Sequence, residues 1–195
     1  MNISEALFHG HSNSIESLKT AGDLILRSVG ENPSREGLER TPARYAKAMK
    51  ELCSGYSLSP KDAVGEGIFQ GVGGLVSVKD IEYFSLCEHH MLPFWGHVSV
   101  AYYPSDKILG LSKIPRMVDV FSKRLQVQER LTKEIAMGMV EVIHPRAVAV
   151  KINGSHMCMM MRGVKKTGSV THTEFSWGLE TLTVEERQRL WQSLE

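Results

Sequence analysis

Residues 76–102 read VSVKDIEYFSLCEHHMLPFWGHVSVAY, and the apolar pattern of this stretch decides the fold. Residues 76–78 alternate apolar and polar, and residues 81–83 continue the alternation on the opposite parity. Alternation of period two predicts a half-buried strand, and the change of parity predicts a bulge near Asp80. The alternation returns at residues 98–102, so we expect a second strand close behind the first.

Downstream, the apolar residues take helical spacing and then strand spacing again. They recur every three or four residues in 112–125 and in 131–142, which predicts two amphipathic helices. Residues 148–152 and 170–177 alternate as strands, and a capping box at residues 183–186 opens a last helix. Strand pairs separated by helices indicate an α+β fold with helices on one face of the sheet.

The region before the first strand is helical and then rich in glycine. Apolar residues recur with helical spacing from Ser14 to Val29, and Thr41 followed by Pro42 predicts the N-cap and first-turn proline of a second helix that fades near Gly55. We therefore expect three parts: an N-terminal helical region (1–55), a glycine-rich linker (56–74) and a larger domain that forms one functional unit (75–195).

The composition describes an ordinary globular protein and excludes several classes. The 195 residues are 42% hydrophobic and 23% charged, which suits one main domain. Lysine and arginine (23) nearly balance aspartate and glutamate (22), so we expect no nucleic acid and no membrane as partner. With no apolar signal segment and three cysteines, an odd number, the sequence predicts a cytoplasmic protein with thiol or metal chemistry rather than disulfides.

Two short motifs offer metal ligands. Cys87 and His90 lie three residues apart and can bind one metal ion from a single turn, and Cys158 could complete the set if the third strand returns to the first. Three protein ligands leave a fourth position for water, as in hydrolytic zinc sites. The alternative is a closed structural zinc site with His89 or His156 as fourth ligand, which spacing alone does not exclude.

Other motifs suggest anion binding and base recognition, although each also has an ordinary structural explanation. Gly110-Leu-Ser-Lys113 enters a helix, where free amides and the helix dipole favour a phosphate. A carboxylate at Glu129 can accept from guanine N1–H and its exocyclic amine, but an acid in a first helical turn is also common. The remaining basic candidates, each of which could equally be a solvated charge, are Arg44, Lys47, Arg116 and Arg162.

In their order along the chain, these motifs resemble those of the GTP cyclohydrolase I family. The matching stretches, between about Ser14 and Gly178, are Cys87-Glu-His-His90, Gly110-Leu-Ser-Lys113, Gln126-Val-Gln-Glu-Arg-Leu-Thr132, His156-Met-Cys158 and Arg162-Gly163. The resemblance implies a T-fold, in which antiparallel sheets of several subunits join into a barrel, and a homodecamer with active sites between subunits. The pair Asn153-Gly154, which ordinarily favours a turn, departs from the extended strand of the family.

The resemblance also implies a role for each matching residue. Cys87, His90 and Cys158 correspond to the zinc ligands, and His89 to the acid/base beside the metal. Glu129 corresponds to the residue that reads guanine, with Gln128 next to it, and His156 lies near the ribose and assists later proton transfers. The residues that correspond to those holding ribose and triphosphate are Ser112, Lys113, Arg116, Arg162, Arg44 and Lys47.

The implied activity is that of a hydrolase acting on a cyclic amidine C–N bond. Water activated by zinc attacks guanine C8 while His89 protonates N7, the ring opens, and C8 leaves as formate. Ribose rearrangement and ring closure then give 7,8-dihydroneopterin triphosphate, the first intermediate of pterin and tetrahydrofolate-type synthesis. Two other functions are alternatives to this activity. One is a non-catalytic zinc-stabilised binding or regulatory module, and the other is a different T-fold enzyme that handles a pterin or a deazapurine. The sequence also leaves open whether a regulatory protein binds this chain.

Overall fold

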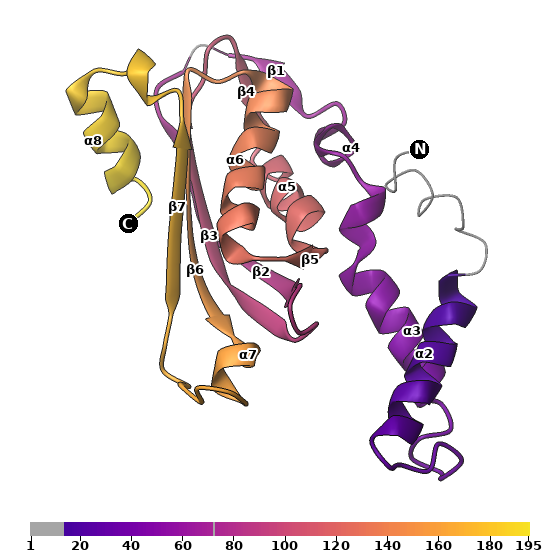
Figure 1. Ribbon diagram of the computed structural model, residues 1–195. Coiled ribbons are helices and arrows are strands. Elements are labelled where there is room, and N and C mark those ends of the chain that lie inside the picture. The colour runs from indigo at the N-terminus through magenta and orange to yellow at the C-terminus, as the bar shows by residue number, and fades with distance from the viewer. Residues whose placement is uncertain (1–13, 72) are drawn as a thin grey trace, which may run out of the picture. The chain divides into compact units, whose positions relative to one another are not determined.

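The computed structural model describes residues 14–71 and 73–195, and the chain divides into two compact units, one up to Cys53 and one from Ser54 onward (Figure 1). The first unit is a helix pair, α2 (Ser14–Ser28) and α3 (Thr41–Leu52). Thr41 is the first helical residue rather than the predicted N-cap, because Arg40 holds that position without a side-chain cap. No described helix is both long and apolar enough to cross a membrane.

The second unit is built on a five-stranded sheet in the order β5-β2-β3-β6-β7. All neighbours are antiparallel except β5, which runs parallel to the end of β2. A separate antiparallel pair consists of β1 and β4. The strands are β1 (Ile68–Gln70), β2 (Val76–Cys87), β3 (Pro93–Tyr103), β4 (Lys107–Leu109), β5 (Leu125–Gln126), β6 (Ala147–His156) and β7 (Thr171–Trp177).

The predicted bulge in β2 is confirmed. The pairing of β2 with β3 shifts register between Val78 and Ile81, and Asp80 has a left-handed φ of 56°. The extra residue restores the inward direction of the side chains, so that Ile81 and Tyr83 are buried and Val78 packs against the same core. The apolar residues change parity along the sequence because the bulge keeps them all on one continuous core face of the strand.

Two helices cover that face of the sheet, as predicted. Figure 1 shows α5 (Lys113–Ser122) and α6 (Gln128–Ile143) side by side over it. Gly138 lets α6 approach α5, since a Cβ there would lie 2.7 Å from the Phe121 ring. The main core forms between these helices and the inward residues of β2, β3 and β6, and its largest members include Phe94, Tyr102, Ile114, Met117, Leu131, Ile135, Met139 and Ile152.

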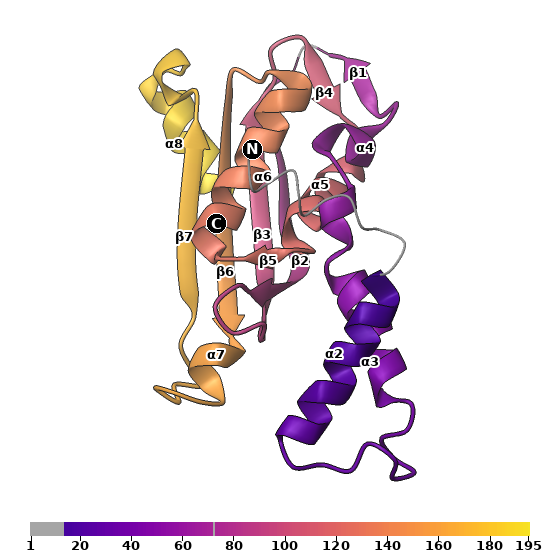
Figure 2. The same ribbon diagram turned by 45° about the vertical axis from the view of Figure 1, so that its right-hand side comes forward.

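The last helix lies on the opposite face. The capping box predicted at Thr183 and Glu186 is present and opens α8 (Val184–Gln192), whose Leu190 packs with Ala101 and Ala149 in a smaller apolar cluster. Figure 2 shows α8 beside β7 and away from α6. Three further short elements are η1 (Ser54–Ser57), α4 (Pro60–Val64) and η2 (Leu179–Thr181).

The register brings three chain segments to one end of the sheet. Leu86 at the end of β2 pairs with Pro93 at the start of β3, and Phe94 pairs with His156 at the end of β6. Asn153 and Gly154, which ordinarily favour a turn, continue β6 without interruption. The predicted metal-ligand motifs therefore meet at this end.

Candidate active site

The turn between β2 and β3 carries the first two candidate ligands. Beyond Cys87, the Met91 amide donates to the Cys87 carbonyl at 2.7 Å, and the Cys87 amide donates to the Leu92 carbonyl at 2.9 Å. Met91 adopts a left-handed φ of 53°, which closes the turn tightly. As a result Cys87 Sγ lies 3.7 Å from His90 Nδ1.

Cys158 reaches this turn from β6. The short helix α7 (Met157–Met160) follows directly on His156 and carries the Cys158 thiol. The donor atoms of Cys87, His90 and Cys158 all lie within 4.8 Å of one another. Among the described residues, this group contains neither His89 nor His156, either of which a closed four-ligand shell would require.

The three donors fit a tetrahedral metal ion. Two thiols and an imidazole are ligands that zinc favours, and with Zn–S of about 2.3 Å and Zn–N of about 2.0 Å neighbouring donors lie roughly 3.5–3.8 Å apart. The distance of 3.7 Å between Cys87 Sγ and His90 Nδ1 agrees. Burial and then the adjacent Cys87 sulfur raise the pKa of the Cys158 thiol. A divalent cation would oppose this effect because it stabilises both thiolates.

His89 lies beside the group and faces solvent. Its side chain is 65% exposed, and its Nδ1 atom lies 3.8 Å from Cys87 Sγ. An exposed imidazole next to a metal cluster can exchange a proton with a bound molecule. The position therefore suits an acid or base.

A pocket of about 310 Å³ opens beside the donor group. Its volume lies at the lower end of the range for small-molecule sites. The exposed residue Glu129, in the first turn of α6, lines this pocket together with the two cysteines. The other lining residues are Cys87, His89, Gln126, Val127, Gln128, His156, Cys158, Met159 and Thr171.

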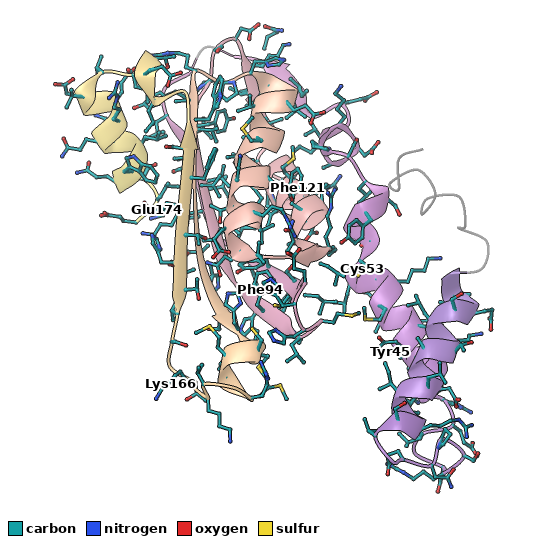
Figure 3. All side chains as sticks on the ribbon, viewed as in Figure 1. Tyr45, Cys53, Phe94, Phe121, Lys166 and Glu174 are labelled. Carbon is teal, nitrogen blue, oxygen red and sulfur yellow. The ribbon has the colours of Figure 1, made fainter. Side chains whose placement is uncertain are left out.

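His156 and Gln128 form the deeper wall of the pocket. The His156 ring stacks on Phe94 with 4.7 Å between ring centroids and 3° between planes, and Figure 3 shows Phe94 at the end of the sheet next to α7. The His156 Nε2 atom lies 2.9 Å from Gln128 Oε1. Burial lowers the pKa of His156, and the Glu129 carboxylate opposes this shift. Burial therefore favours the neutral form of the ring.

The predicted anion-binding residues of the second unit do not all gather around this pocket. Only Arg162 lies close, with Nη1 3.1 Å from His90 Nε2. Ser112 and Lys113 stand at the start of α5, a helix about 15 Å long whose other end leads into β5 and the pocket. Arg116 instead lines a separate hollow of about 220 Å³. Arg44 and Lys47 belong to α3 in the first unit.

A network of charged and polar side chains next to the Cys87 turn was not predicted from the sequence. Arg130 pairs with Glu88 and donates to Gln126 Oε1 at 2.8 Å, and Gln126 donates to Glu134 at 2.7 Å. The hydrogen bond from Arg130 lowers the pKa of Glu88. Because Glu88 and Arg130 come from different elements, neither spacing nor composition signals their pairing. This network ties Glu88, the residue that follows Cys87 in the turn, to Arg130 of α6.

Comparison with known proteins identifies relatives over most of the chain. The sequence model described as GTP cyclohydrolase I matches residues 18–195. A protein of Deinococcus radiodurans named GTP cyclohydrolase 1 is 52% identical over 79% of this chain and 72% of its own length. The protein of that name in Chlorobium chlorochromatii is 46% identical over 91% of this chain and 80% of its own. For the Neurospora crassa protein of that name, 50% identical, the chain spans about half the length (51%).

Proposed function

The chain belongs to the GTP cyclohydrolase I family, and we propose that it converts GTP and water to 7,8-dihydroneopterin triphosphate and formate. Family membership confirms the α+β T-fold predicted from the sequence. The observation that carries the proposal is the thiol–imidazole–thiol group that borders one pocket together with His89, His156 and Glu129. A reaction that opens one ring and closes another needs several proton transfers, and this pocket offers two imidazoles for them.

We propose that the cofactor is zinc. When bound by Cys87, His90 and Cys158, zinc supplies a Lewis acid that activates water for attack on C8 of guanine. The mixed sulfur and nitrogen donors favour zinc over magnesium or calcium, which prefer oxygen ligands. The chain's own contribution is to hold these three donors within 4.8 Å of one another while leaving His89 outside the group.

The two imidazoles and the carboxylate would divide the remaining work. His89, exposed beside Cys87, donates a proton to guanine N7 as the ring opens. Glu129 accepts hydrogen bonds from N1–H and the exocyclic amine, a bidentate match that adenine cannot offer. His156, stacked on Phe94 at the edge of the pocket, can accept a proton during the later steps.

We further propose that the triphosphate is held by a neighbouring copy of the chain in a homo-oligomer, by family resemblance a decamer with sites between subunits. Lys113 and Arg116 support this proposal because they lie toward the far end of α5 from their own pocket. Together with Ser112, Arg44, Lys47 and Arg162, they would bind and orient GTP. The phosphates stay intact, so these cations position the substrate rather than activate a leaving group.

Turnover of GTP by zinc-loaded protein tests the proposal. We expect formate and neopterin triphosphate from the wild type, and loss of both in His89→Ala. His97→Ala is the matched control, because His97 is exposed on the opposite face of the sheet and should leave turnover intact. A well-assembled, zinc-loaded wild type that leaves GTP unchanged would refute the enzyme and favour a non-catalytic zinc-stabilised module.

A further inference from the structure

The buried side chain of Gln128 has its orientation fixed by the protein alone. Gln128 is 1% exposed, and its amide nitrogen donates to the Ile152 carbonyl at 3.2 Å and to the Thr171 carbonyl at 3.0 Å. Main-chain carbonyl oxygens only accept hydrogen bonds. The nitrogen end of the amide must therefore face these two strands, and the oxygen end must face the other way.

Two threonine hydroxyls strengthen this orientation. Thr132 Oγ1 donates its hydroxyl proton to the main-chain carbonyl oxygen of Gln128 at 2.7 Å, so that proton is not available for another hydrogen bond. The Thr173 hydroxyl, 2.7 Å from Thr132 Oγ1, must then donate to it, and its own oxygen is free to accept from the Gln128 amide at 3.1 Å. Every proton in this chain of hydrogen bonds thus has one direction.

The consequence falls on His156. The Gln128 oxygen lies 2.9 Å from His156 Nε2, and an amide oxygen only accepts, so Nε2 must carry a hydrogen. The neutral imidazole keeps its lone pair on Nδ1. Within residues 14–71 and 73–195, Nδ1 has no hydrogen-bond partner, and stacking on Phe94 holds the ring plane.

Gly154 leaves the space that this arrangement occupies. A Cβ at Gly154 would lie 2.3 Å from Gln128 Oε1 and 2.5 Å from the Tyr83 hydroxyl. Neither atom can withdraw easily, because both side chains are almost fully buried. The glycine that suggested a turn in the sequence therefore lets a buried amide reach His156 across β6.

We infer that Gln128 is a positioning residue that holds His156 in the tautomer with hydrogen on Nε2, so that Nδ1 is the atom offered to the substrate as proton acceptor. The catalytic consequence rests on the proposed function, whereas the tautomer does not. The family resemblance places Gln128 next to the base-reading Glu129, but both amide hydrogens of Gln128 are engaged by the protein, so its task is to hold His156.

The tautomer can be read directly from the ring nitrogens. We would label histidine with nitrogen-15 in the full-length, zinc-loaded protein and record the NMR spectrum without GTP, about two units above the ordinary histidine pKa of about 6.5. A His156→Asn variant assigns the ring among the eight histidines. The inference expects a hydrogen on Nε2 and none on Nδ1. A hydrogen on Nδ1, alone or together with Nε2, would overturn it.

A pair of variants tests the catalytic consequence. Gln128→Met should release the tautomer and lower kcat roughly 10–100-fold, by analogy with the loss of a hydrogen-bond partner behind a metal-binding histidine, with little change in KM for GTP. Gln126→Met is the matched control for the tautomer, since Gln126 is equally buried but does not contact His156. A loss confined to KM, with the tautomer retained, would show that Gln128 reads the base and would overturn the inference.

The design also separates this inference from the proposed function. If Gln128→Met fails to assemble, the wild-type spectrum alone decides the tautomer. A wild type with the Nε2 hydrogen but without GTP turnover would overturn the proposed function and still support the assignment of the tautomer.

Discussion

At the scale of single residues, the candidate metal ligands form a group only because different elements bring them together. Cys158 on α7 is an ordinary thiol until β6 places it beside Cys87 and His90. Burial and then the neighbouring Cys87 sulfur raise the pKa of its thiol, and a bound cation would oppose this shift. Because Cys158 supplies one of the three donor atoms of this group, metal binding should depend steeply on its sulfur.

We predict that Cys158→Ser weakens zinc binding by more than about 100-fold, because even changes next to a ligand cost 10–100-fold. Equilibrium competition with a chromophoric chelator measures the affinity. Cys53→Ser is the control, since Cys53 lies in the first unit and outside the donor group. Equal zinc affinity in the two variants would contradict the assignment of Cys158 as a ligand.

At this scale the sequence predicts those site residues whose type and spacing are typical of metal binding. The Cys87–His90 pair and the later Cys158 could be named from residue type and spacing, and the structure brings them together. The engagement of Gln128 could not be foreseen, because its partners Ile152 and Thr171 depend on how β6, β7 and α6 pack. A buried hydrogen-bond network has no period in the sequence.

At the scale of elements, close pairing of β3 with β6 holds the two halves of the site together. The pairing runs from Phe94 with His156 to Tyr103 with Ala147. Two residues from the Phe94–His156 end, Gly96 faces Gly154, and a Cβ on Gly96 would lie 1.9 Å from the Asn153 carbonyl oxygen. Backbone approach this tight leaves no room for any side chain.

We predict that Gly96→Ala destabilises the protein by about 1–3 kcal/mol, because the backbone of β6 must move away and overpacking carries such a cost. Denaturant unfolding of the assembled protein measures the change. Gly168→Ala provides the comparison, since a Cβ there meets nothing within 4 Å. If both variants unfold alike, the close approach of the two strands is wrong.

Long periodic elements could be predicted, whereas short ones could not. The bulge at Asp80 and the capping box at Thr183 each leave a signature over several residues, and both are confirmed. Strands β1, β4 and β5 have three, three and two residues, which is too short for any period to show. Gly154 misled because its local turn preference is overridden by pairing on both sides.

At the scale of the whole molecule, the second unit carries the possible metal-binding group and the proposed base-reading Glu129 near one end of α5, and the basic residues Lys113 and Arg116 toward the other end. Within the second unit of one copy, Lys113 and Arg116 would stand apart from the pocket proposed to hold the base. Assembly therefore has a chemical purpose in this account, since each site would combine the two ends from different copies. The cytoplasmic location, the three-part domain division and any regulatory partner stay predictions.

We predict that subunits carrying Lys113→Ala and subunits carrying His89→Ala, each inactive alone, regain activity when co-expressed. Random mixing leaves about a quarter of the sites with both groups intact if the two come from different copies. GTP turnover of the purified mixed oligomers measures this fraction. Complete inactivity of the mixture would mean that each chain builds its own site.

The central claim is that this chain removes C8 from GTP and keeps the phosphates, and GTP labelled with carbon-13 at C8 tests it most directly. With zinc-loaded protein, the account predicts labelled formate and an unlabelled pterin triphosphate in equal amounts, with no inorganic phosphate. Label retained in the nucleotide, or release of phosphate in place of formate, would contradict it.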